Sequence, residues 1–310
     1  MEDTEFSGAY TQQAELFALR FRARLKLSVH RRSLSALAGP NRSSMRGRGL
    51  DFDEVRAYQP GDEVRAIDWR VTARTGSAHT KLYREERERP VLIVTDQRQP
   101  MFFGSQKCFK SVLAAQVTGL LAWSALRNND RVGGFVWGQQ EHVEVRPKRS
   151  KASVLKLLHT VHEFNNRLGA DNIDARAPLS INTALTDLRR ITRPGSAVFI
   201  VSDFHDFDTD ASKHLFNLAR HNEVTAVFTY DQLEQNLPPA GQYTVTDGLR
   251  RGVLNTRGAK LRDSYAQQFR RRRENLHTSL ASYGVPLIEL QTGCRPLTEL
   301  LKYYAYQRGS

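Results

Sequence analysis

Residues 90–96, Pro-Val-Leu-Ile-Val-Thr-Asp, decide how this chain folds. Five consecutive apolar or β-branched residues between a proline and an aspartate predict a strand buried on both faces, as is typical of parallel sheets. Similar runs predict further strands over Val132 to Trp137, Ala197 to Ser202, Val224 to Tyr230 and Val285 to Leu290. The segment His142 to Arg146 is predicted to pair with the second of these strands as a hairpin.

Helical patterns separate the predicted strands. We expect helices from about Ser105, with that serine as N-cap, to Asn128, around Val154 to Val161, over Ala211 to His221, over Lys260 to Tyr283, and from Pro296 onward. Parallel neighbours require crossover connections of this kind. The sequence therefore predicts an α/β fold over residues 89–310, a doubly wound, mostly parallel sheet covered on both faces.

An aspartate follows three of the predicted strands, at Asp96, Asp203 and Asp231. In open α/β sheets, ligands bind beyond the carboxyl ends of the strands. The turns that carry these aspartates are therefore where we expect a functional site. The acidic loop after Asp203 is interpreted as a strand-to-helix connection in which Asp208 or Thr209 caps the next helix.

Composition narrows the class of protein. The 310 residues carry a formal net charge of +13 and include two cysteines, which excludes a disulfide scaffold and a thiolate metal cage. The polar, acidic first residues do not resemble a signal peptide. The longest uncharged stretch, Ser111 to Leu126, is too short to span a bilayer. We expect a soluble cytoplasmic protein.

Basic residues gather before the sheet domain. A basic helix is predicted over Gln12 to Leu27, and residues 1–88 are expected to pack on the core as an extension rather than to fold alone. Nine cations and no acids lie between Leu16 and Leu50: Arg20, Arg22, Arg24, Lys26, Arg31, Arg32, Arg42, Arg46 and Arg48. Binding of nucleic acid or an anionic surface through this region is one alternative function. The absence of a nucleic-acid motif favours a solvated face or an acidic partner.

The segment from Arg56 to Glu88 resembles the signature of a bacterial family, the domain of unknown function 58 family. The match is carried by Arg-Ala-Tyr-Gln-Pro-Gly-Asp at 56–62, Arg65, Ile-Asp-Trp at 67–69, Arg74 and the charged run that begins at Glu85. Gly47 to Phe52, with Asp51 in place of a glutamate, and the segment from Phe103 to Lys110 extend the resemblance.

The resemblance implies a von Willebrand factor A-like fold, in agreement with the strand and helix order predicted above. It also implies a partnership with MoxR-type AAA+ ATPases in assembling or activating other proteins. Many family members carry two transmembrane helices before the domain, and this chain resembles a short version without them.

Domains of the von Willebrand A type usually bind Mg²⁺, and the resemblance places Asp96, Thr183 and Asp203 at three of the ligand positions. The two serines of the pattern are replaced by Arg98 and Pro100. Proline lacks a hydroxyl, and a fixed positive charge opposes a divalent ion. We therefore expect a remnant site and no cofactor, with Mg²⁺ binding as an alternative. Arg98 is either a built-in cation that pairs with Asp96 or Asp203, or a solvated side chain.

The candidate structural or interaction residues of the signature are charged or aromatic except for one glycine; they are Arg56, Tyr58, Gly61, Asp62, Arg65, Asp68, Trp69, Arg74, Glu85, Glu86 and Arg98. Charges such as Arg65 and Asp68 suit a paired network, whereas Tyr58 and Trp69 suit an interface centre. No catalytic constellation is recognisable. The sequence thus predicts a non-enzymatic protein-interaction domain, a partner or adaptor of a MoxR-type AAA+ ATPase that acts on an unknown client protein. A metal-dependent hydrolase using Asp96 and Asp203 is the remaining alternative.

Overall fold

The computed structural model describes residues 6–27, 50–59, 64, 67–85, 89–169, 178–246 and 250–306. The chain forms two compact units, one made of Met1–Ser28 with Arg89–Ser310 and the other of Val29–Glu88. The first unit, which we call the sheet domain, contains the sequence that predicts the fold. The second, which we call the signature unit, contains most of the family-like motif.

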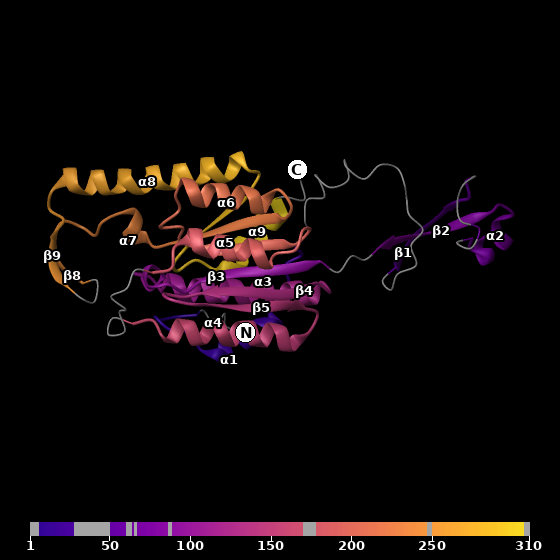
Figure 1. Ribbon diagram of the computed structural model, residues 1–310, viewed down its shortest axis with the longest axis horizontal. Coiled ribbons are helices and arrows are strands. Elements are labelled where there is room, and N and C mark those ends of the chain that lie inside the picture. The colour runs from indigo at the N-terminus through magenta and orange to yellow at the C-terminus, as the bar shows by residue number, and fades with distance from the viewer. Residues whose placement is uncertain are drawn as a thin grey trace. The chain divides into compact units, whose positions relative to one another are not determined.

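A six-stranded sheet forms the centre of the sheet domain (Figure 1). Its strands in spatial order are β5 (His142–Lys148), β4 (Arg131–Trp137), β3 (Pro90–Asp96), β6 (Ala197–Ser202), β7 (Glu223–Tyr230) and β10 (Leu287–Gln291). All neighbours are parallel except the β4–β5 hairpin. The order reverses between β3 and β6, which is the switch point of a doubly wound sheet. The predicted α/β fold is confirmed.

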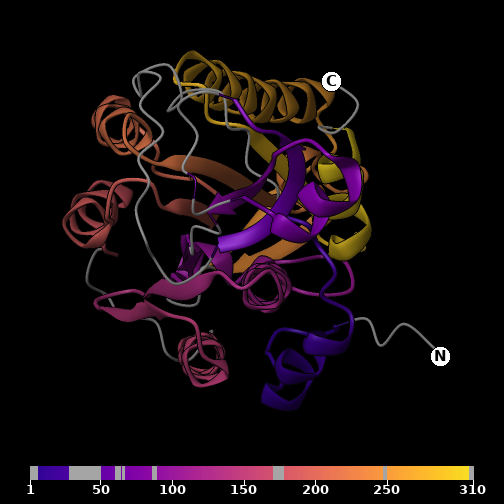
Figure 2. The ribbon, with the colours of Figure 1, turned by 90° about the vertical axis from the view of Figure 1, so that its right-hand side faces the viewer.

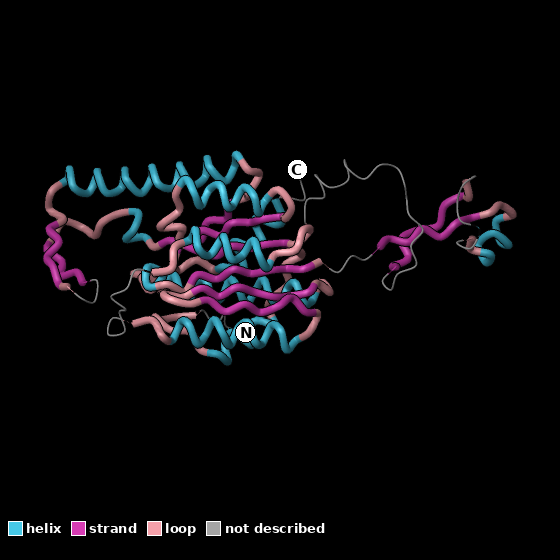
Figure 3. Tube along the Cα trace, in the orientation of Figure 1, coloured by secondary structure: helices cyan, strands magenta, loops and turns pink. Residues whose placement is uncertain are grey.

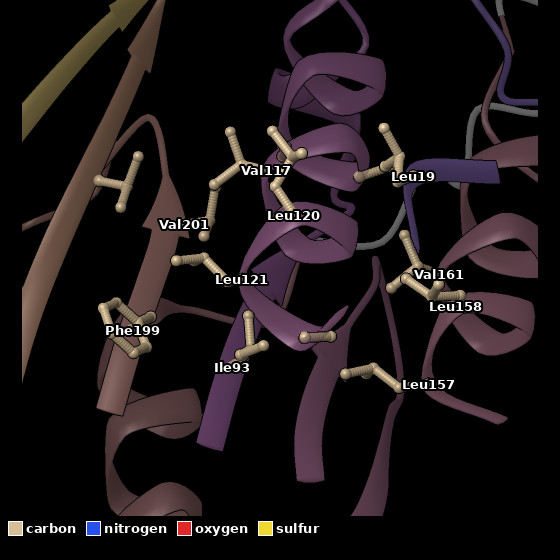
Figure 4. Packing of buried hydrophobic residues seen from close by; sticks show 14 of the residues in the cluster. Leu19, Ile93, Val117, Leu120, Leu121, Leu157, Leu158, Val161, Phe199 and Val201 are labelled. Atoms are coloured by element: carbon tan, nitrogen blue, oxygen red, sulfur yellow. The ribbon is translucent and has the colours of Figure 1, made fainter. Parts of the chain in front are cut away.

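Helices cover both faces of the sheet, and each face has its own hydrophobic core (Figure 2). One face packs against α3 (Lys110–Arg127), α4 (Lys151–Asn166), α9 (Pro296–Tyr306) and the N-terminal helices. The other packs against α5 (Ile181–Ile191), α6 (Thr209–Ala219) and α8 (Ala259–Ser282). In Figure 4, α3 lies between the sheet residues Ile93 and Val201 on one side and Leu158 of α4 on the other.

The N-terminal segment differs from its prediction. Instead of one helix over residues 12–27, the chain forms α1 (Gln13–Ala18) and a 3₁₀ turn over Leu19–Phe21. Residues 23–27 are irregular, with Ala23 and Leu25 buried and Arg24 and Lys26 exposed. The backbone N–H of Leu25 donates to Ser124 Oγ at 3.2 Å. Alternating burial is typical of an extended segment. The backbone of this segment forms a contact with α3 in place of the hydrogen bonds of a continued helix.

The start of α3 also differs from its prediction. The helix begins at Lys110 rather than near Ser105. The preceding loop is so tight at Gly104 that an added Cβ would lie 2.7 Å from the backbone oxygen of Cys108. Ser105 is used elsewhere in the fold, as described below. The delayed start leaves Lys110 at the first turn of α3, where its side chain is buried.

The signature unit consists of the antiparallel hairpin β1 (Leu50–Ala57) and β2 (His79–Glu85) with α2 (Trp69–Thr75) between them in sequence (Figure 3). Asp68 caps α2 by accepting hydrogen bonds from the N–H groups of Arg70 and Val71. Of the side chains described in this unit, only that of Thr80 is buried. A two-stranded hairpin is marginal in isolation.

After β7 the chain forms α7 (Gln232–Gln235) and a second small hairpin, β8 (Gln242–Thr246) with β9 (Arg251–Asn255). Most side chains of this hairpin are exposed. Within the described part of the chain, no helix combines the length and apolarity that a membrane crossing requires.

Candidate functional site

The site lies at the switch point, where β3 and β6 end side by side. Asp96 is the last residue of β3, and Asp203 directly follows β6. Both carboxyl groups belong to residues that are almost completely buried. Such groups require partners, because an unpaired buried charge is strongly destabilising.

Arg98 is the partner of Asp96. Its Nη2 lies 2.9 Å from Asp96 Oδ2, and its Nε donates to Asp96 Oδ1 at 3.1 Å. The other side of the guanidinium forms a bidentate pair with Asp206, at 2.8 and 2.9 Å, and donates to the carbonyl oxygen of Leu179. The guanidinium also lies 4.4 Å from the centre of the Trp137 ring. Arg98 is therefore a buried cation paired with Asp96, as one of the two interpretations of the sequence proposed.

Asp203 is paired with a different cation. Lys110 Nζ, at the start of α3, donates to Asp203 Oδ2 at 2.7 Å and to Glu234 Oε1 at 2.8 Å. Lys110 is 1% exposed, so its ammonium group is removed from water. The sequence analysis did not identify this role. We refer to the two cations with Asp96, Asp203, Asp206 and Glu234 as the cation-paired site.

The electrostatics follow from burial and pairing. Burial alone would raise the pKa of Asp203, but the ammonium of Lys110 lowers it to about 2. Burial would lower the pKa of Lys110, yet Asp203 and Glu234 raise it above its ordinary value. Burial raises the pKa of Asp96 in spite of Arg98. Since the hydrogen bonds that Asp96 receives from Arg98 and from Ser202 Oγ use both of its oxygens, we assign it as a carboxylate.

The third strand-end aspartate, Asp231, connects three loops. Its carboxylate accepts hydrogen bonds from the N–H and hydroxyl of Ser105, at 2.8 and 2.6 Å, from the N–H of Leu233 and from the hydroxyl of Thr292. Burial would raise the pKa of Asp231, but these donors lower it. Ser105 therefore holds Asp231 instead of capping α3. Because these donors use both of its carboxylate oxygens, Asp231 serves to hold together the loops at the carboxyl ends of the strands.

Thr183 does not join the aspartates. It lies exposed in the first turn of α5, where its hydroxyl is 3.1 Å from Ser180 Oγ. The N-terminus of α5 reaches the cation-paired site through another group, because the N–H of Ile181 donates to Asp206 Oδ2 at 2.8 Å. Asp208 caps α6 through the N–H groups of residues 210 and 211, as predicted.

The signature residues lie in the other unit. Trp69 is exposed at the start of α2, Arg74 is exposed near its end, and Tyr58 is half-buried. Arg56 is half-buried and donates to the carbonyl oxygen of Ala57. The remaining positions are Glu85, which ends β2, and Gly61, Asp62, Arg65 and Glu86, which lie outside the described residues. Five of the nine N-terminal cations, all within residues 31–48, also lie outside them.

The residues at the switch point do not fit a Mg²⁺ ion. Magnesium requires oxygen ligands in a near-octahedral arrangement. Here the carboxylates of Asp96 and Asp203 face Arg98 and Lys110, and a divalent ion would meet both positive charges. Within the described residues, no group of three or more histidine, cysteine, aspartate and glutamate side chains is arranged to hold a metal. No reaction step is therefore derived through a metal.

The topology and the position of the site define a doubly wound α/β protein whose site lies at the switch point of the sheet. A family model described as "Protein of unknown function DUF58" matches residues 54–275, and this chain belongs to that family. The match includes most of the signature unit's hairpin and the whole cation-paired site.

This chain is also similar to several individual proteins. Uncharacterized proteins of Mycobacterium bovis and Mycobacterium tuberculosis are each 26% identical over 286 residues, which cover 92% of this chain and 88% of theirs. The crystal structure of the conserved hypothetical protein BatB from Bacteroides thetaiotaomicron is 14% identical, with a TM-score of 0.43, over 72% of this chain and 100% of that one. A von Willebrand factor type A structure from Catenulispora acidiphila is 12% identical, with a TM-score of 0.33, over 74% and 43%.

Proposed function

We propose that this chain is a non-enzymatic protein-interaction protein that works as a partner or adaptor of a MoxR-type AAA+ ATPase. The family assignment supports an interaction role in general. The choice of ATPase follows from the family resemblance seen in the sequence. The partnership requires both proteins in the same compartment, which we expect to be the cytoplasm.

The pairing at the switch point supports a role without catalysis. A general base or nucleophile needs a free lone pair near the substrate. The carboxylates of Asp96 and Asp203 are instead occupied by Arg98 and Lys110. Their arrangement fixes the loops at the edge of the sheet and presents no reactive group of its own.

The observation that carries the proposal is the apolar exposure of the signature unit. Trp69 is 66% exposed and Val64 is 59% exposed. Tryptophan is among the residues that dominate binding energy at interfaces, and exposed apolar side chains favour association. A partner that covers Trp69 would bury apolar surface that the described residues of this unit leave exposed.

The test is a binding titration of the full chain against a MoxR-type ATPase from the same organism, with nucleotide present. We expect a complex whose dissociation constant rises by roughly 30-fold or more in Trp69→Ala, as for an interface hot spot. Phe21→Ala is the matched control, because Phe21 is an aromatic residue of the sheet domain with 64% exposure. It should leave binding unchanged. No complex at micromolar concentration and no change in the ATPase rate would refute the partnership.

A further inference from the structure

The helices α6 and α8 lie on the face of the sheet away from α3 (Figures 1 and 2). Residues of both helices line a groove. Its volume is about 470 Å³. Aromatic and aliphatic side chains line part of it: Phe204, Phe207, Phe228 and Leu276. Hydroxyl groups and two arginines line the rest, among them Thr209 and Ser212 of α6 and Arg272 and Arg273 of α8. The groove therefore combines an apolar part with a positively charged part.

Among the described residues, Arg272 is the arginine of the groove that has no carboxylate partner. Its Nη1 contacts His205 Nδ1 at 3.1 Å, and its guanidinium lies 5.7 Å from the centre of the Phe269 ring. Its Nη2 is buried and has no hydrogen-bond partner among the described residues. The adjacent Arg273 differs, because Glu289 accepts its Nε hydrogen bond at 2.9 Å. An unsatisfied buried donor is costly, and a carboxylate is its strongest acceptor in proteins.

The groove has one carboxylate of its own, and that group is already engaged. Asp208 accepts hydrogen bonds from the N–H of Ala211 at 2.8 Å and from Asn182 Nδ2 at 3.1 Å. These bonds cap α6 and hold α5 beside it. The N-terminus of α6 adds the positive end of a helix dipole to the same groove. The dipole favours an incoming anion at Arg272, while the hydrogen bonds of Asp208 keep that carboxylate directed at the N-terminus of α6 and at Asn182.

We infer that this groove binds an acidic segment of a partner protein, with a carboxylate on Arg272 and an apolar side chain against Phe207 and Leu276. The inference rests on the proposed function and assigns a second contact to it. A polypeptide suits the groove better than a nucleic acid, because Phe204 and Phe228 are buried and Phe207 is the one partly exposed aromatic side chain among the described residues of the lining. Base stacking along a single strand calls for successive aromatic faces. Phosphate binding would also call for several unpaired cations along a strand.

The cation-paired site supports the wall of this groove. The loop after β6 carries Asp203 and Asp206, which are paired with Lys110 and Arg98. The same loop carries Phe204 and Phe207, which line the groove. Phe204 has a positive φ of 48°, a conformation that costs energy for an aromatic residue. The buried ion pairs on either side of it hold the loop in this conformation.

The experiment is a selection of short random peptides on the immobilised full chain, followed by titration of the enriched peptides by fluorescence anisotropy. We expect aspartate or glutamate next to an aromatic or large aliphatic residue. Arg272→Gln should weaken binding by about tenfold or more, as expected for a lost charge-assisted hydrogen bond. Arg271→Gln is the matched control, because Arg271 is exposed on the same helix and does not line the groove.

A second variant tests the groove without removing its cation. Thr278 lines the groove from α8 and is exposed, so Thr278→Trp should fill the cavity and abolish peptide binding while the melting temperature is kept. Three outcomes would each overturn the inference. The enriched peptides could lack acidic residues, Arg271→Gln and Arg272→Gln could lose peptide affinity equally, or oligothymidylate could bind through Arg272 more tightly than the peptides do. If the ATPase complex forms but no acidic peptide is enriched, only the groove assignment fails; if acidic peptides bind but no complex forms, the partnership fails.

Discussion

Replacing Lys110 by methionine tests the cation-paired site most directly. Methionine keeps much of the length of the side chain but removes the ammonium that contacts Asp203 at 2.7 Å and Glu234 at 2.8 Å. Asp203 is buried, so it would be left as a charge without its main partner. Breaking a buried pair in this way costs about 3–5 kcal/mol of unfolding free energy. We expect Lys110→Met to lose stability in this range at pH 7.

The pH dependence of this loss has a definite sign. In the native chain the pKa of Asp203 is lowered from 3.8 to about 2, so its contribution is present above pH 3.8 and is lost as the pH falls toward 2. That contribution is on the order of 2 kcal/mol. Without Lys110, burial is opposed less and raises the pKa of Asp203. The unfolding free energy of the variant should therefore fall as the pH rises from about 4 to 7. Over the same range, titration of Asp203 leaves the unfolding free energy of the native chain unchanged.

Urea unfolding at several pH values measures both the loss of stability at pH 7 and its dependence on pH. The midpoint and slope of each curve show whether the variant and the native chain unfold in comparable transitions. Lys107→Met is the control, because Lys107 is an exposed neighbour in the same loop. The double variant Lys110→Met with Asp203→Leu should recover part of the loss, since replacing both ions by apolar groups removes the unpaired charge. A loss below about 1 kcal/mol in the single variant, or a pH profile like that of the native chain, would refute this account.

Three further predictions concern the same edge of the sheet. Arg98→Ser with Pro100→Ser should not create Mg²⁺ binding, because Lys110 still faces Asp203; adding Lys110→Ser should produce binding measurable by calorimetry, and equal heats in the two variants would contradict the pairing. Asp231→Asn should destabilise the chain by about 2–4 kcal/mol in urea, because an amide nitrogen would face donors; an unchanged midpoint would exclude the connecting role. Gly104→Ala should cost about 1–3 kcal/mol, since its Cβ would meet backbone at 2.7 Å, and calorimetric melting should show this as a lower transition temperature.

The sheet could be predicted from sequence because its central strands β3, β4, β6 and β7 are buried on both faces. Runs such as Val91 to Thr95 are apolar or β-branched throughout, as is typical of strands in a covered parallel sheet. Helix termini were less predictable. Serine is a favoured N-cap residue, but the hydroxyl of Ser105 donates to Asp231 instead. The helix α3 therefore begins five residues later, at Lys110.

The carboxylates of the site were predictable, but one of their cations was not. Asp96 ends β3, Arg98 lies two residues beyond it and Asp203 directly follows β6, so the rule for strand ends places them together. Lys110 is the first residue of α3, and lysines at helix starts are usually solvated. The one signal in the sequence is its position directly before the uncharged stretch Ser111 to Leu126, which indicates that α3 is buried from its first turn. Sequence reasoning alone cannot show that Asp203 lies across from it.

The two positive charges at the switch point are parts of the polypeptide. An ion held by coordination exchanges with the medium and can be withdrawn by a chelator, whereas a guanidinium and an ammonium on the chain are present at fixed stoichiometry from the moment of folding. The loops at the carboxyl ends of β3 and β6 would therefore keep their arrangement whatever the concentration of free divalent ions.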